Sequence, residues 1–236
     1  MTRTRPSPIR GRDVLWLTVV IVVSVMLGTS LVLTALFLFD RSVFQPGAPK
    51  FTILLVSTLV QVGAIIFAVH LVLHRKRGIE WRDVGVVPAS LQTLIMGVLI
   101  GVLLAGAMEA IERLAGISLG NLVTGLIAPG GFTWPAYLSV LLLIGVATPV
   151  AEELFFRGVI FNWMRTRWRP SVAITLNAAL FGIIHLYYPP PYIVLVGSLG
   201  AIFAYAFERS RNIWLPVALH TGHNSAVVTA IYFSLA

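Results

Sequence analysis

Seven apolar stretches follow one another along the chain, each long enough to cross a bilayer as a single helix. Short polar segments separate these stretches. The pattern predicts an all-α, polytopic membrane helical bundle with about seven transmembrane helices. The approximate ranges are 14–39, 51–73, 90–111, 134–162, 171–187, 190–208 and 213–234. A further segment, 114–133, is apolar but interrupted by glycine and proline, which fits a loop, a surface helix or a re-entrant helix.

Basic residues between the stretches predict the orientation in the membrane. Thirteen precede the first stretch or follow the second, fourth and sixth, and three lie in the alternate segments, with Arg157 left aside. The thirteen are Arg3, Arg5, Arg10, Arg12, Arg75, Lys76, Arg77, Arg82, Arg165, Arg167, Arg169, Arg209 and Arg211. Because basic segments stay on the cytoplasmic side, we expect a cytoplasmic N-terminus and an outer C-terminus. Residues 1–13 would be a basic cytoplasmic tail, and 14–133 the leading spans with an outer loop.

The composition excludes several classes of function. Of the 236 residues, 58% are hydrophobic and 11% are charged, whereas soluble domains carry about 25% charged residues. The absence of cysteine excludes disulfides, a thiolate nucleophile and cysteine-ligated metal. The net charge of +8 comes from the segments between the spans, and no nucleic-acid-binding motif is present, so we expect the lipid bilayer and no nucleic acid as a partner.

Ionisable side chains inside the apolar stretches are functional candidates, because burying charge in lipid is costly. They are Glu152, Glu153, Arg157, His185, His220 and His223, with Asn224 as a polar neighbour. At about 1.5 Å per residue, Glu152 and His185 lie roughly 20 Å from the basic ends of their helices. His220 and Asn224 lie roughly 11 and 17 Å from the start of theirs. The overlapping depths predict one buried polar cluster built from three helices.

Spacing within the helices refines this cluster. Glu153 and Arg157 are four residues apart, so we expect an ion pair along one helix face that leaves Glu152 pointing elsewhere. Outside the cluster, Glu109 and Arg113 have the same spacing and predict a surface pair. Gly97 and Gly101 form a GxxxG pair, which predicts close packing against a helix of this chain or of another.

Four roles fit a cluster of glutamates, histidines and asparagine. The residues could activate water as a general base and stabilise an oxyanion. They could also bind zinc, lock helices together as a structural network, or carry protons in coupled transport. We expect no metal cofactor, with zinc on Glu152, His185 and His220 as the alternative.

Three short motifs resemble those of one known family. The segment EELFFR (Glu152–Arg157) is similar to the EExxxR motif of the CPBP family, the CAAX proteases and bacteriocin-processing enzymes also called Abi. The segments FGIIH (Phe181–His185) and HTGHN (His220–Asn224) look like its FxxxH and HxxxN/B motifs. The motifs occur in the family's order within 134–234, which the resemblance makes a catalytic CPBP-like core.

The resemblance implies an intramembrane endopeptidase that hydrolyses a peptide bond. It implies that Glu152 and His185 activate water, that His220 and Asn224 hold the oxyanion, and that Glu153, Arg157 and Phe181 support them. His223 lies outside the motif and is expected to be a bystander. We expect a peptide or protein substrate, which in some members is lipid-modified, and a site that opens toward the cytoplasm in a multi-pass protein of the plasma (inner) membrane if the source is bacterial. The alternative functions are a non-catalytic immunity or scaffold protein of the same fold and a proton-coupled transporter.

Overall fold

The computed structural model describes residues 8–44, 51–116, 120–186 and 188–236. Arg3, Arg5 and most of the expected basic tail lie outside the described residues, as does part of 114–133. Helix α1 begins at Gly11, so the last residues assigned to the tail belong to the first helix.

The described residues form helices and contain no β-strand. The helices are α1 (Gly11–Phe39), α2 (Phe51–Ala68), α3 (Leu91–Leu114), α4 (Gly120–Ile127), α8 (Pro170–Ile183), α9 (Pro190–Ser210) and α10 (Trp214–Phe233). A wider π-helical turn, η2 (Val69–Arg75), continues α2. The longest helix, Trp134–Met164, runs through α5 (Trp134–Val140), η4 (Leu141–Ala147), α6 (Thr148–Glu153), η5 (Leu154–Phe161) and α7 (Asn162–Met164). Short 3-10 turns lie at η1 (Arg41–Phe44) and η3 (Trp81–Val84).

Helix starts follow the local sequence. The hydroxyl groups of Ser90 and Thr133 accept hydrogen bonds from the first turns of α3 and α5, which satisfies otherwise unpaired amides. Proline opens α8 and α9, where its missing N–H costs nothing.

Among the described residues, five helices are long and apolar enough to cross a membrane: α1, α2 with η2, α3, Trp134–Met164 and α9. The chain is therefore a polytopic helical membrane protein. The other two predicted spans correspond to α8, with 14 residues, and α10, with 20 residues. The count of seven and the direction of the N-terminus stay predictions. Part of the broken segment 114–133 is helical, as α4.

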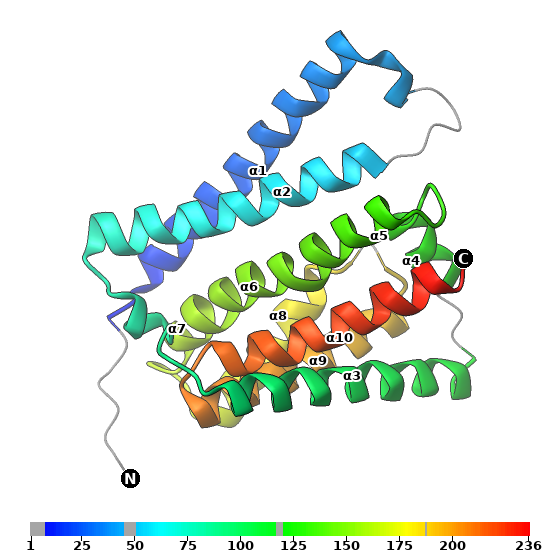
Figure 1. Cartoon of the computed structure of the whole chain (residues 1–236). Coiled ribbons are helices and arrows are strands. Elements are labelled where there is room, and N and C mark those ends of the chain that lie inside the picture. The colour runs from blue at the N-terminus through cyan, green and yellow to red at the C-terminus, as the bar shows by residue number, and fades with distance from the viewer. Residues whose placement is uncertain (1–7, 45–50, 117–119, 187) are drawn as a thin grey trace.

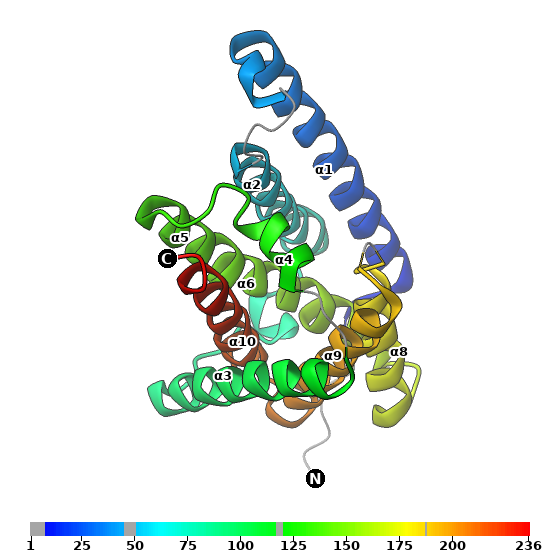
Figure 2. The same ribbon diagram turned by 90° about the vertical axis from the view of Figure 1, so that its right-hand side faces the viewer.

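Helix α10 lies between α3 and the Trp134–Met164 helix and also packs against α9 (Figures 1 and 2). Its contact with α3 is close, because a Cβ on Gly101 would lie 2.1 Å from the Leu219 carbonyl oxygen, and one on Gly222 would lie 2.2 Å from that of Val98. The predicted GxxxG packing is thus within this chain. Helix α1 packs on α2 and leans away from the other helices at its C-terminal end.

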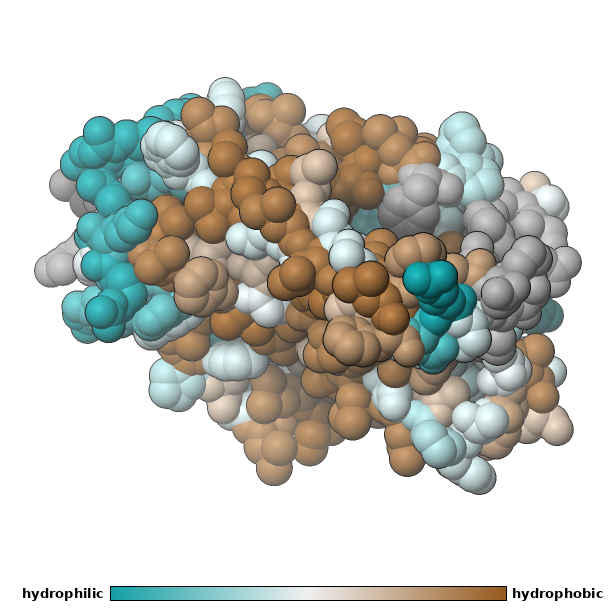
Figure 3. All heavy atoms as spheres, turned by 90° about the horizontal axis from the view of Figure 1, so that it is seen from above, coloured by the Kyte–Doolittle hydropathy of each residue, from teal (hydrophilic) through white to brown (hydrophobic). Residues whose placement is uncertain are grey.

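The loops with most of the basic residues meet at one end of the bundle. There the Ile213 amide donates to the Gly85 carbonyl at 2.8 Å, and the Asn212 side chain donates to the Pro88 carbonyl at 3.0 Å. Arg165 pairs with Glu208 at 2.9 Å across the same end. We call this the basic end and the opposite one the far end. Between them the surface is largely hydrophobic, as lipid contact requires (Figure 3).

Candidate active site

The two glutamates lie in the middle of the long helix, between its π-helical turns η4 and η5. Such wide turns shift the side chains that follow relative to a regular helix, and they are frequent at functional sites. Pro149, which removes a backbone donor, lies just after η4. The helix nevertheless continues through this point, and Glu152 and Glu153 are both buried.

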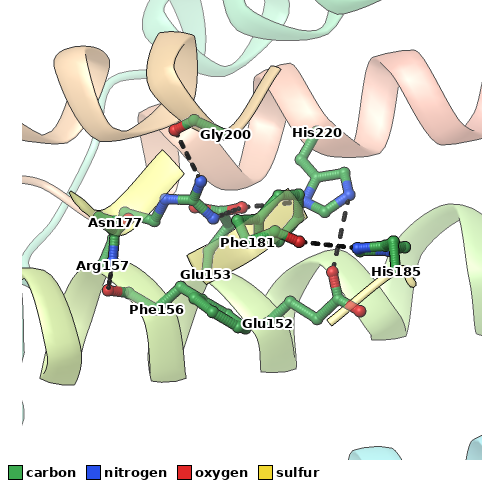
Figure 4. Close-up of polar contacts among 9 residues, drawn as sticks. All are labelled: Glu152, Glu153, Phe156, Arg157, Asn177, Phe181, His185, Gly200 and His220. Atoms are coloured by element: carbon green, nitrogen blue, oxygen red, sulfur yellow. Dashed lines mark hydrogen bonds and ion pairs between the residues drawn. The ribbon is translucent and has the colours of Figure 1, made fainter. Parts of the chain in front are cut away.

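Glu153 forms the centre of a charged network. Its Oε1 accepts a hydrogen bond from Arg157 Nη1 at 2.8 Å, which confirms the ion pair predicted from their spacing. The same oxygen lies 2.9 Å from His220 Nδ1 on α10 (Figure 4). Both Glu153 and Arg157 have no exposed side-chain area. A buried pair of this kind is stabilised further when its remaining polar atoms also find partners.

Arg157 finds some of those partners on α9 and α8, whereas its Nε and Glu153 Oε2 are buried without a hydrogen-bond partner in the described structure. Its second terminal nitrogen donates to the Gly200 carbonyl at 2.9 Å. The guanidinium carbon lies 4.6 Å from the centre of the Phe181 ring and 5.5 Å from that of Phe203. Aromatic faces attract a desolvated cation, so Phe181 supports the site through Arg157.

The contact with Glu153 also decides where His220 carries its proton. An ionised carboxylate only accepts hydrogen bonds, so His220 Nδ1 must be the donor. In the neutral imidazole, Nε2 is then the basic nitrogen. This Nε2 lies 4.0 Å from Glu152 Oε2 (Figure 4). Glu152, unlike Glu153, forms no ion pair with arginine in the described structure.

His185 lies just beyond the C-terminal end of α8. Its Nδ1 is 2.8 Å from the Phe181 carbonyl oxygen. Because a carbonyl can only accept, Nδ1 carries the hydrogen and Nε2 is the basic nitrogen. The ring also stacks near Tyr188, with centres 6.3 Å apart. Asn177 lies on α8, one turn before Phe181. Its side chain donates a hydrogen bond to the Phe156 carbonyl at 3.1 Å and so joins α8 to the helix that carries the glutamates.

Asn224 completes the set of motif residues. One hydrogen of its amide nitrogen is donated to the Ile144 carbonyl at 3.1 Å. In a regular α-helix, the backbone N–H four residues later would bind this carbonyl. Ile144 lies in the π-helical turn η4, where that bonding pattern is changed. The amide nitrogen has a second hydrogen, which can be donated to another acceptor.

All four expected catalytic residues line one cavity of about 360 Å³. Glu152, His185, His220 and Asn224 come from three different segments, as their depths predicted. His223, expected to be a bystander, lines the same cavity, with its Nδ1 buried and without a hydrogen-bond partner. Thr148 likewise contributes a buried hydroxyl oxygen. Spacing could have indicated Thr148, which lies one turn before Glu152.

Other parts of the cavity wall were not predicted. Helix α2 contributes Ser57, Thr58 and Gln61, and α4 contributes Val123, Leu126 and Ile127. These helices belong to the leading part of the chain, where no motif pointed to a site. The polar residues of α2 were the available signal, since they are spaced to share one face of a span.

The described part of the chain contains no group of three or more histidine, aspartate or glutamate side chains arranged to hold a metal ion. Glu152, His185 and His220, named above as the zinc alternative, are not among such groups, and the expectation of no metal cofactor stays a prediction. Glu153 and the Phe181 carbonyl engage the Nδ1 atoms of His220 and His185, so Nε2 is the basic nitrogen of each ring.

Comparison with known proteins agrees with the motifs. Residues 134–226 match the family model described as Type II CAAX prenyl endopeptidase Rce1-like. We call residues 134–226 the Rce1-like segment, after the family that they resemble. The match confirms the resemblance to the CPBP family. The Rce1-like segment runs from the start of α5 into α10 and contains all three motifs.

One curated relative also matches a part of the chain. The chain is 27% identical over 89 residues to "Putative membrane peptidase YdiL" of Bacillus subtilis (strain 168). This match covers 38% of the chain and 36% of the relative, so the two align over little more than a third of either. No solved structure matches the chain.

Proposed function

We propose that this chain is an intramembrane endopeptidase that hydrolyses peptide bonds with water activated by Glu152 and His185. The observation that carries the proposal is the meeting of Glu152, His185, His220 and Asn224 at one cavity within the apolar part of the bundle. The Rce1-like segment and the resemblance to a protein named as a membrane peptidase support the same reaction class.

In the proposed reaction, Glu152 takes a proton from the water whose oxygen attacks the peptide carbonyl. Glu152 is suited to this because Arg157 neutralises Glu153 instead. His185 helps to orient that water, because its Nε2 carries a lone pair that can accept a hydrogen bond from it. The protonated Glu152 then gives its proton to the leaving amine nitrogen as the C–N bond breaks, so that one water is consumed for each peptide bond.

The negative oxygen of the intermediate needs donors. The second N–H of Asn224 supplies one. His220 supplies another only when both its nitrogens carry hydrogen, because Nδ1–H is used by Glu153. Glu153 stabilises that imidazolium form, and this is the role we assign to it. Glu153 and Arg157 are thus positioning residues, which act through His220.

For the substrate, we propose a peptide or protein that lies at the membrane, and the family description makes a prenylated C-terminal peptide the first probe of cleavage. If the source is bacterial, we propose that the protein lies in the plasma membrane. We propose a metal-free reaction: treatment with a chelator should leave cleavage unchanged. Loss of activity that zinc restores would contradict this part of the proposal.

The test is the substitution Glu152→Gln, which keeps the size of the side chain and removes the base. Loss of general-base catalysis should lower cleavage by about 10²–10⁴-fold. We would compare membrane peptidomes of cells with the wild type and with this variant, and follow an internally quenched farnesylated peptide ending in Cys-aliphatic-aliphatic-Ser. His185→Ala should behave alike.

The matched control is Glu109→Gln, which removes a carboxylate from an exposed pair on α3. It should cleave as the wild type does. If Glu152→Gln leaves both the peptidome and the peptide assay unchanged, the protein is not a peptidase of this kind, and the non-catalytic scaffold becomes the better interpretation.

A further inference from the structure

The cavity extends from Glu152 in one direction only, toward the far end of the bundle. On the glutamate helix it is lined by Ile144, Thr148 and Glu152, and by nothing C-terminal to Glu152. On α10, which runs the opposite way, the first lining residue is His220. The remaining lining residues on α10 are His223, Asn224, Val227 and Val228.

On the other helices, too, the residues that line the cavity lie toward the far end. Helices α2 and α9 approach the site from the far end, and their last lining residues are Gln61 and Phe203. Helix α8 comes from the basic end and begins to line the cavity only at Phe181, in its last turn. Helix α4 lies at the far end, in the foreground of Figure 2, and contributes three apolar side chains.

Packed side chains close the cavity on its other side. Between Glu152 and the basic end lies a core that includes Phe156, Phe161, Phe207 and Val217, each at most 7% exposed. The fully buried Glu153–Arg157 pair lies in the same layer. Interiors of this kind are close-packed and leave no path for water or for a peptide. The cavity therefore differs from the expected site that opens toward the basic loops.

Charge predicts which side of the membrane this is. The basic end carries the arginine-rich loops, and such loops remain in the cytoplasm. Among the described residues, the far end holds Arg41, Arg113 and the C-terminus. We therefore infer that substrate reaches Glu152 from the non-cytoplasmic side of the membrane.

This inference narrows the substrate class, a step that rests on the proposed function. Polypeptides available on that side are exported peptides and the outer segments of membrane proteins, whereas proteins modified and retained in the cytoplasm are not. The cavity wall suits an extended segment with apolar side chains. Val123, Leu126 and Ile127 offer apolar contact, while Gln61 and His223 offer polar groups to a peptide backbone.

The absence of cysteine gives a direct test, because every introduced thiol is unique. Val227→Cys places a thiol in the cavity and Val217→Cys places one in the closing core, both on α10. Arg211→Cys and Leu235→Cys report the basic end and the far end. Each variant is treated with a membrane-impermeant maleimide in right-side-out and inside-out vesicles.

We expect Val227→Cys and Leu235→Cys to react in right-side-out vesicles and to be protected in inside-out vesicles until detergent is added. Arg211→Cys should show the reverse, and Val217→Cys should react in neither. Reaction of Val227→Cys only from the side on which Arg211→Cys reacts would overturn the inference. So would an inverted protein, with Arg211→Cys outside and Val227→Cys inside.

Cleavage provides the second arm. An impermeant quenched peptide should be cut in right-side-out vesicles with the wild type and not with Glu152→Gln. Cleavage only in inside-out vesicles overturns the inference and leaves the proposed function intact. No cleavage from either side, or in detergent, contradicts the proposed function, while the labelling still decides the side on which the cavity opens.

Discussion

The contact between α3 and α10 holds two candidate catalytic residues in place, although α3 does not line the cavity. Gly101 lies against the backbone of α10, where an added Cβ would be 2.1 Å from the Leu219 carbonyl oxygen and 2.8 Å from the His223 nitrogen. Leu219 immediately precedes His220. Backbone atoms cannot rotate away as a side chain can, so Gly101→Ala must push the two helices apart.

The size of the effect follows from these distances. Restoring ordinary van der Waals contact requires a separation of about 1 Å. A displacement of about 1 Å in a catalytic group can lower the rate about 10²-fold. The overpacking itself should lower the free energy of unfolding by about 1–3 kcal/mol. We therefore expect Gly101→Ala to fold, with a reduced melting temperature, and to lose about 10²-fold in kcat/KM.

The assay is cleavage of the quenched peptide by purified protein in detergent, with thermal unfolding measured on the same samples. Gly106→Ala is the matched control, because it adds the same methyl group to the same helix where no atom lies within 4 Å of it. It should retain wild-type activity. If Gly101→Ala and Gly106→Ala have equal activity, α3 does not position His220, and the reasoning is refuted.

Two further predictions concern stability. Arg157→Met leaves Glu153 buried without its cation, so thermal and denaturant unfolding should show a loss of about 3–5 kcal/mol. The exposed pair gives the control, since Arg113→Ala should cost at most about 1 kcal/mol, and equal losses at the two sites would contradict the burial argument. Tyr232→Phe removes the hydroxyl that donates to the Ile127 carbonyl at 3.0 Å, and should cost about 1 kcal/mol in the same measurement. An unchanged melting temperature would show that this bond does not hold α4 against α10.

Much of the site could be predicted because polar residues in lipid-facing sequence are rare and their depths can be counted. Glu152, His185 and His220 were placed together on that ground, and the Glu153–Arg157 pair followed from helical spacing. The sequence also predicts which glutamate pairs with Arg157, since only Glu153 lies four residues before it. The motif resemblance added roles, which no observation here tests.

The rest depended on packing between distant segments. The participation of α2 and α4 arises from tertiary contacts, which a pattern of apolar positions does not encode. The wide turns η4 and η5 leave no trace in hydrophobic periodicity. The closure of the cavity toward the basic end depends on how Phe156 and Phe161 of the Trp134–Met164 helix pack against Phe207 of α9, and hydrophobic periodicity does not encode such a contact.

The ion pair within one helix has a consequence for how the protein is made. Since Glu153 and Arg157 are four residues apart on the same helix, their charges can neutralise each other as soon as that helix winds. The helix can then leave the translocon carrying one uncompensated acid, Glu152, in place of three separate charges. Its later neighbours α8, α9 and α10 need not be synthesised before it partitions into lipid. Pairing the arginine with a glutamate on another helix would have made insertion of this segment wait for the rest of the chain.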